Sequence, residues 1–222
     1  LNTGFEKMKN AVPVEKIKLE TGCEDNFDGL KLDSHPDPEK WTLNETAGSV
    51  LIAEDPEKSK NRVLLISTEP GGNTSASRAC FTGVTYKTLT FECRMMLSEC
   101  TTYDLFYNSL GKTAVSWILR KQNGKNTITL SHRTTNSGYG EDITELNQDE
   151  WYDFKIAFKP GNTTTTRVLF YINDELVLET DKYYNEGVEG RWPQKENKTL
   201  AFTAFNAAKG NLYIDDLKVT VE

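Results

Sequence analysis

Short stretches of alternating apolar and polar residues follow one another along most of the chain, and Gly, Asn, Asp and Pro separate them. These stretches are rich in β-branched and aromatic residues, which favour the pleated surface of a strand. No window with the 3.6-residue period of a helix is of comparable strength. The first predicted strand begins with Val14, Ile17 and Leu19. The pattern then predicts strands over 49–53, 62–67, 77–82, 88–97, 103–109, 114–121, 126–132, 151–159, 167–173, 175–180, 198–206 and 211–221.

The turn residues agree with an antiparallel arrangement. Asn123-Gly124 and Asn173-Asp174 each lie between two apolar runs, and such pairs are typical of tight hairpins. Many short strands with no intervening helices are typical of a sandwich or barrel. The sequence therefore predicts an all-β fold, a two-sheet antiparallel jelly-roll sandwich that forms one domain over 14–222 and follows a leader or linker at 1–13.

Composition argues against a membrane-spanning segment and against a nucleic-acid partner. The 222 residues include 37% hydrophobic residues, enough for a packed core, but the apolar runs are only a few residues long. We therefore expect no membrane span. The formal net charge of -7 argues against a nucleic-acid partner, because binding to phosphates depends on a concentrated basic surface.

The four cysteines are Cys23, Cys80, Cys93 and Cys100, and their spacing matches no zinc motif. In an oxidising compartment they would form two disulfides, with three connectivities open. Cys80 and Cys93 lie on consecutive predicted strands, so one hypothesis pairs them across a hairpin. The alternative is that all four are buried free thiols.

Three local patterns resemble the concanavalin-A-like lectin and glucanase superfamily, including its laminin-G-like and carbohydrate-binding relatives. The first is Asn26-Phe27-Asp28-Gly29 followed by Trp41, the second is the segment 150–156 leading into 168–177, and the third is the closing strand 212–219. The resemblance implies a jelly roll at the cell surface or outside the cell, with a polysaccharide or oligosaccharide on its concave sheet. The patterns consist mostly of core and turn residues, so they specify a fold better than an activity.

Catalytic signals are weak. The jelly-roll glucanases carry an E-x-D-x-(x)-E strand whose alternate carboxylates project into the cleft, and this motif is missing here. If the protein is an enzyme on this fold, Glu92 and Asp104 are the proposed acid and base, and His132 with Arg133 and Tyr139 is a separate candidate for proton transfer. The alternation of its strand places His132 toward the core, which favours a structural histidine.

Strand alternation also predicts an outer face. Phe91 and Trp117 are expected to point inward, so the residues that alternate with them point outward. If these strands are neighbours in the concave sheet, that sheet displays a charged face suited to an acidic sugar, because arginine donates paired hydrogen bonds to carboxylates and hydroxyls. The alternative is an ordinary solvent-exposed sheet face of mixed charge. The predicted ligand-binding residues are Arg78, Glu92, Arg94, Asp104, Arg120 and Arg133, with Tyr139 and Trp192 in flanking loops.

The resemblance further implies one structural calcium ion between the two ends of the domain. Calcium prefers several oxygen ligands, and the predicted ligands are Asp28, Asp215 and Asp216, with Glu20, Glu24 and Asp25 in reserve. The alternative is that Asp215-Asp216 marks a β-bulge, because this pair breaks the alternation of Ile214 with Leu217.

Taken together, these patterns favour a noncatalytic carbohydrate-binding or adhesion module of a secreted or surface bacterial protein. A polysaccharide lyase or glycoside hydrolase on the same fold is one alternative. A structural or protein-binding domain is the other.

Overall fold

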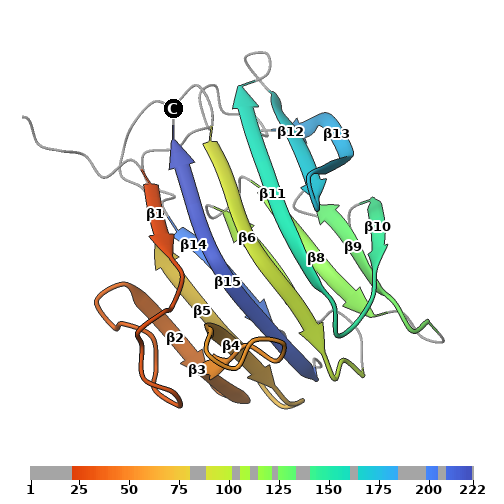
Figure 1. Ribbon diagram of the computed structural model, residues 1–222. Helices are drawn as coiled ribbons and strands as arrows, with labels where there is room; N and C mark the ends of the chain where they lie inside the picture. The colour runs from red at the N-terminus through yellow and green to blue at the C-terminus, as the bar shows by residue number, and fades with distance from the viewer. Residues whose placement is uncertain are drawn as a thin grey trace, which may run out of the picture.

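The protein is a sandwich of two antiparallel sheets, which lie one behind the other in Figure 1. The computed structural model describes residues 22–80, 89–101, 106–110, 115–121, 125–133, 141–160, 165–184, 199–204 and 209–221. Sheet A has the order β13-β12-β11-β6-β15-β4-β3, with β1 also paired to β15, and sheet B has the order β10-β9-β8-β7-β14-β5-β2. The strands are β1 (Gly22–Asp25), β2 (Trp41–Glu45), β3 (Gly48–Glu54), β4 (Arg62–Thr68), β5 (Thr74–Ala79), β6 (Leu89–Ser98), β7 (Phe106–Leu110), β8 (Val115–Lys121), β9 (Ile128–Arg133), β10 (Asp142–Leu146), β11 (Trp151–Pro160), β12 (Thr165–Ile172), β13 (Glu175–Tyr184), β14 (Thr199–Ala204) and β15 (Gly210–Val221).

The predicted all-β jelly-roll sandwich is confirmed, and each of the twelve strands predicted between 49 and 221 has an observed counterpart. Sequence analysis missed β1, β2 and β10, which have only four or five residues and carry several exposed polar side chains. Such segments lack the run of alternating apolar residues that identifies a strand. The predicted leader at 1–13 and the strand expected from Val14 to Leu19 lie outside the described residues.

The hairpin between β12 and β13 has the geometry that its sequence predicts. Asn173 and Asp174 have φ of 50° and 64°, and positive φ at both central residues is typical of the type I′ turn. Asn and Asp tolerate this conformation better than other side chains that carry a Cβ. The predicted Asn123-Gly124 turn lies outside the described residues, but β8 and β9 on either side of it pair antiparallel as expected.

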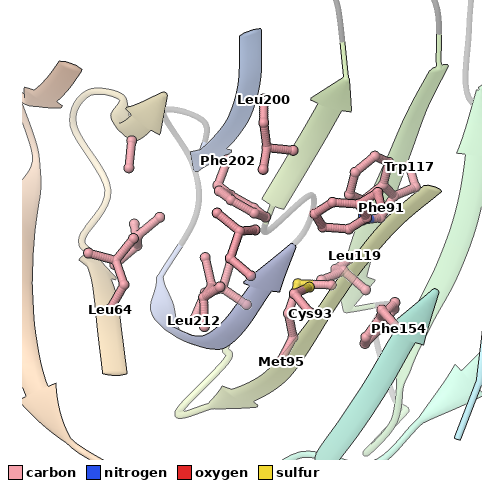
Figure 2. Close-up of a cluster of buried hydrophobic side chains, with 14 of the residues drawn as sticks. Leu64, Phe91, Cys93, Met95, Trp117, Leu119, Phe154, Leu200, Phe202 and Leu212 are labelled. Atoms are coloured by element: carbon pink, nitrogen blue, oxygen red, sulfur yellow. The ribbon is translucent and has the colours of Figure 1, made fainter. Parts of the chain in front are cut away.

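The core lies between the two sheets and is built from the residues that alternation predicted to point inward. Figure 2 shows Phe91 and Cys93 of β6 close to Trp117 and Leu119 of β8, with Phe202 of β14 beside them. The ring centroids of Phe91 and Trp117 are 5.1 Å apart. Since Phe91 and Trp117 come from opposite sheets, this contact joins the two layers.

A β-bulge interrupts the closing strand. Leu212 and Ile214 point into the core, as do Leu217 and Val219, so the alternation shifts by one residue between these pairs. The pairing of β15 with β6 shifts between Asp215 and Lys218, and Asp216 has φ of 48°. The predicted bulge at Asp215-Asp216 is therefore confirmed.

The hypothesis of a Cys80–Cys93 disulfide across a hairpin is wrong. Cys80 directly follows β5 of sheet B, whereas Cys93 lies on β6 of sheet A and is buried in the core. Consecutive strands of a jelly roll often cross to the other sheet, so neighbours in sequence need not be neighbours in space. All four cysteines are free thiols, and Cys80 contacts Cys23.

The described residues contain no helix with the length and apolar character that a membrane crossing needs.

Candidate functional site

The predicted charged face is divided between the two sheets. Glu92 and Arg94 lie on β6 of sheet A, whereas Arg120 and Arg133 lie on β8 and β9 of sheet B. The prediction that these residues share one face is therefore wrong. Alternation along a strand gives the side on which a residue lies but not the sheet that the strand joins. The side chain of Arg133 and the residues Asp104, Tyr139 and Trp192 lie outside the described residues.

Arg78 lies inside the sandwich, contrary to the prediction that it faces outward. Its side chain is 8% exposed and donates to Oδ2 of Asp25 at 2.7 Å. The guanidinium also lies over the ring of Trp41, and the indole Nε1 donates to the same Asp25 oxygen at 3.1 Å. Thr74 and Ala76 share the inward side of β5 with Arg78. This ion pair joins β1 of sheet A to β5 of sheet B, so Arg78 is a structural residue.

The outer face of sheet A carries a closed group of polar and aromatic side chains, here called the Arg94 cluster: Asp55, Asn61, Arg94, Trp151 and Asp215. The Arg94 guanidinium lies 4.5 Å from the centroid of the Trp151 ring and Nη1 is 3.5 Å from Oδ2 of Asp215. Asn61 Nδ2 donates to Asp215 at 2.7 Å and to Asp55 at 3.1 Å. Burial raises the pKa of Asp215, because it disfavours the charged carboxylate.

Asp55 anchors the loop that covers this cluster. Its side chain is 1% exposed and accepts from the backbone N–H of Glu57 at 2.8 Å and from Trp151 Nε1 at 3.2 Å. Burial by itself would raise the pKa of Asp55, but these hydrogen bonds and the nearby Arg94 charge outweigh it and lower the pKa. The Asn61 amide and the Trp151 indole N–H thus donate to carboxylates within the protein, and Arg94 is paired with Asp215.

The outer face of sheet B has a different character across β2, β5 and β14. Trp41, Ala76 and Phe202 point into the core, so the residues that alternate with them point outward. The strand registers place these outward residues in two lines across the sheet, Asn44 beside Ser75 beside Thr203, and Thr42 beside Ser77 beside Ala201. All six are exposed or partly exposed, and we call them the polar row: Thr42, Asn44, Ser75, Ser77, Ala201 and Thr203.

A second group on the outer face of sheet B consists of Arg120, Ser131 and Asp142, here called the Arg120 cluster. Arg120 Nη2 donates to Oδ1 of Asp142 at 2.8 Å and to the hydroxyl of Ser131 at 3.4 Å. The Ser131 hydroxyl donates to the same Asp142 oxygen at 2.7 Å. The neighbouring Thr129 is 2% exposed, and its hydroxyl has no hydrogen-bond partner among the described residues. Leaving a buried hydroxyl without a hydrogen-bond partner is costly in free energy.

The registers connect the polar row to the Arg120 cluster. Thr203 of β14 is paired with Tyr107 of β7, which is paired with Ile118 of β8, and Ile118 is paired with Ser131. Ser131 is in turn paired with Asp142. One line of cross-strand neighbours therefore runs from Asn44 to Asp142 on the outside of sheet B.

The proposed pairing of Glu92 with Asp104 stays a prediction, because Asp104 lies outside the described residues. Glu92 lies on the outer face of sheet A, where it pairs with Lys155 at 3.2 Å. His132 is fully buried between the sheets, with its ring 6.1 Å from that of Phe170. Sheet A therefore separates Glu92 from His132, so these two candidates do not share a site. The prediction that His132 points toward the core is confirmed.

The predicted calcium ligands are partly brought together. Asp28 and Asp216 line one pocket between the opening loop and the closing strand, and Glu24 and Asp25 line it too. Asp215 does not line it, because its side chain faces Asn61 and Arg94. No three His, Cys, Asp or Glu side chains of the described residues are grouped as a metal ion would require. The pocket thus offers carboxylates of the right kind without a complete set of ligands as it stands.

Sequence reasoning missed the polar row because it looked for charge. The signal available was the run of small hydroxyl residues at 74–77 and the short side chains of β14. Serine and threonine are common on any solvent-exposed strand, so their presence alone does not indicate a binding face. The strand registers are needed to show that these residues lie side by side across the sheet.

No protein-family model matches the chain. No curated protein matches it in sequence either.

Several solved structures match the fold along nearly their whole length. A conserved carbohydrate esterase of a Shiga toxin-encoding bacteriophage gives a TM-score of 0.61 at 12% identity and covers 90% of this chain and 100% of that one. An endo-1,3-beta-glucanase from Streptomyces sioyaensis gives 0.59 at 12% identity, covering 95% and 99%. The metal-free carbohydrate recognition domain of Emp46p gives 0.55 at 14% identity, covering 92% and 98%.

These likenesses show that the chain has the concanavalin-A-like jelly-roll fold, as the resemblance in sequence implied. Identities of this size show the fold alone. The three proteins include two enzymes and one recognition domain, so the fold is compatible with both catalysis and binding of carbohydrates.

Proposed function

We propose that the protein is a noncatalytic carbohydrate-binding or adhesion module that binds a polysaccharide or oligosaccharide on the outer face of sheet B. The observation that carries the proposal is the continuous line of cross-strand neighbours from the polar row to the Arg120 cluster. A secreted or surface location is part of the proposal, since glycans of this kind lie outside the cell.

The side chains of the polar row suit an extended sugar chain. Ser75, Ser77 and Thr203 are short, so a chain of sugar rings can approach the backbone of the sheet closely. Their hydroxyls both donate and accept, as sugar hydroxyls do. At β2 the exposed Asn44 adds an amide, and its Oδ1 is held by the Thr46 hydroxyl at 2.7 Å. A sheet face that binds a glycan needs short side chains, so that the sugar rings can approach, and groups that can both donate and accept hydrogen bonds.

The Arg120 cluster provides charge at the other end of this line. Asp142 keeps 53% of its side chain exposed, while Arg120 keeps 16%. An arginine held in place by a carboxylate donates strong hydrogen bonds at low entropic cost, which suits a sugar hydroxyl or the carboxylate of an acidic sugar. The buried Thr129 hydroxyl lies on the same face beside Arg120.

Binding is favoured over catalysis by the state of the carboxylates on this face. Asp142 accepts from Arg120 and Ser131, and Glu145 accepts from Lys125 and from Thr127 at 2.9 Å. The hydrogen bonds from Lys125 and Thr127 lower the pKa of Glu145. A glycosidase acid needs a raised pKa, so these contacts act in the wrong direction for proton donation.

A glycan array followed by product analysis tests the proposal. The protein is expected to retain at least one plant, host or microbial glycan, and prolonged incubation is expected to leave that glycan intact. Release of shorter or unsaturated products would overturn the noncatalytic proposal in favour of a hydrolase or lyase. A blank array would favour a structural or protein-binding domain.

We also propose one structural calcium ion in the pocket lined by Asp28 and Asp216. The support is that two carboxylates far apart in sequence line the same pocket as Glu24. An ion bound there would link the opening loop to the closing strand and would stabilise the folded state by mass action. Asp25 is engaged by Arg78 and Asp215 lies elsewhere, so neither is included.

The calcium proposal predicts that the melting temperature rises with added calcium and falls with a chelator. Asp216→Asn should remove this response, whereas Asp174→Asn, which changes an exposed carboxylate in the β12–β13 turn, should keep it. The proposal would be contradicted if neither calcium nor a chelator changed the melting temperature of the wild-type protein.

A further inference from the structure

The opening strand and the end of β5 carry two cysteines that contact each other across the sandwich. Cys23 lies on β1, which belongs to sheet A, and Cys80 follows directly after β5 of sheet B. Their thiols interact with each other, and this contact shifts the pKa of both groups. The two thiols are therefore neighbours although 57 positions separate them in sequence, from 23 to 80.

The neighbouring ion pair fixes this contact. Asp25 and Cys23 lie on the same side of β1, two residues apart, and Arg78 and Cys80 are related in the same way at the end of β5. The Arg78–Asp25 pair at 2.7 Å is thus one cross-link between the sheets, and the two thiols lie at the next equivalent position. The two thiols therefore face each other between the sheets, as a disulfide between the sheets would require.

The two thiols differ in reactivity. Cys23 is half-buried, and the pKa of its thiol is lowered by the contact with the Cys80 thiol and by the positive charge of Arg78, which together outweigh its burial. Cys80 is 2% exposed, and both the contact with Cys23 and burial raise its pKa. A partly exposed thiol that favours the thiolate is a good nucleophile, and a buried neighbour suits the second step of disulfide exchange.

We propose that Cys23 and Cys80 form a disulfide that joins the two sheets when the protein meets an external disulfide such as oxidised glutathione. The Cys23 thiolate attacks one sulfur of glutathione disulfide, forms a mixed disulfide and releases one glutathione thiolate. Cys80 then loses its proton and attacks the Cys23 sulfur, which releases the second glutathione. One external disulfide is reduced to two thiols, and the two cysteine thiols are oxidised to one disulfide.

The bond would anchor β1, which has four residues and pairs only with β15 among the described strands. A cross-link between residues 23 and 80 closes a long loop, which restricts the unfolded chain more than a short loop does. For a chain of this size the oxidised form is expected to melt roughly 5–10 °C above the reduced form.

The test is to incubate the native protein with oxidised glutathione, block the remaining thiols under denaturing conditions and map the peptides by mass spectrometry. The expected result is a protein that lacks two hydrogen atoms, a cross-linked peptide pair containing Cys23 and Cys80, and a higher melting temperature that dithiothreitol reverses. Persistent glutathione on Cys23, or alkylation of both Cys23 and Cys80 after oxidation, would overturn the proposal.

Matched variants assign the effect. Cys23→Ser should abolish the rise in melting temperature on oxidation, whereas Cys100→Ser, which changes another buried thiol, should retain it. If either variant fails to fold, the peptide map of the wild-type protein still decides between the two outcomes. A rise that survives in Cys23→Ser would assign the stabilisation to a different pair and contradict the proposal.

Discussion

The outer faces of sheets A and B both carry arginine and carboxylate side chains, but the two faces use them differently. On sheet A, Arg94 lies against Trp151 and Asp215, and the loop anchored by Asp55 covers them. On sheet B, the Arg120 cluster lies at one end of a line of cross-strand neighbours, and the partly exposed polar row lies at the other end. Charge alone therefore does not mark a ligand face. What distinguishes sheet B is the polar row on β2, β5 and β14, whose six short side chains are all exposed or partly exposed.

The largest expected effect comes from breaking the Arg94 cluster. Asp55→Ala removes the acceptor for Glu57 N, Asn61 Nδ2 and Trp151 Nε1, and leaves these donors without their partner. Losing a buried charged acceptor should lower the free energy of unfolding by about 2–4 kcal/mol. Urea unfolding measures this loss, and glycan affinity of the folded fraction should not change.

Glu54→Ala is the control for that variant. The Glu54 side chain is 51% exposed and pairs with Arg62 at 3.5 Å. A surface ion pair of this kind contributes little to the free energy of unfolding. A stability loss equal to that of Asp55→Ala would mean that the loop, and not the buried carboxylate, carries the effect.

Two arginine substitutions compare the faces directly. Arg120→Ala should weaken glycan binding by about 10- to 100-fold, because it removes charge-assisted hydrogen bonds from the ligand face. Arg94→Ala should leave the affinity unchanged and reduce stability, since Arg94 packs on Trp151. Isothermal titration with the glycan found on the array measures the affinity of each variant. Equal losses of affinity in Arg120→Ala and Arg94→Ala would contradict the assignment of the ligand to sheet B.

The pH dependence of stability tests the role of the Asp55 charge on sheet A, and its expected effect is smaller than those of the substitutions above. The pKa of Asp55 is lowered in the folded protein from its ordinary value of 3.8, so its contribution is present above that value and lost as the pH falls through the lowered pKa. The stability difference between wild type and Asp55→Asn should therefore shrink as the pH drops below about 4. A difference that stays constant down to pH 2 would show that the charge of Asp55 is irrelevant.

Much of the fold follows from local sequence pattern. Alternation correctly placed Phe91, Trp117 and His132 in the core, and the break between Ile214 and Leu217 correctly predicted the bulge. These features depend on residues within one strand, which a sequence displays directly. The Asn173-Asp174 turn is predictable for the same reason.

The candidate site was less predictable, because it depends on which strands become neighbours. Arg94 and Arg120 have the same parity on their strands, yet the chain places them on opposite sides of the molecule. Arg78 was misplaced because β5 begins at Thr74 and ends at Ala79, so Phe81 gave no guide to its parity. Jelly-roll crossovers are long-range features, and a single sequence carries no local signal for them.

The most direct test of the central claim compares one bulky substitution on each face. Ser75 lies on the outer side of β5 in sheet B, and Ser67 lies on the outer side of β4 in sheet A, both partly exposed. Glycan affinity is measured for Ser75→Trp and Ser67→Trp after both are shown to fold. We predict that Ser75→Trp loses at least about tenfold in affinity, because the indole fills the space above the polar row, whereas Ser67→Trp binds like the wild type. Loss of binding in Ser67→Trp with full binding in Ser75→Trp would contradict the account.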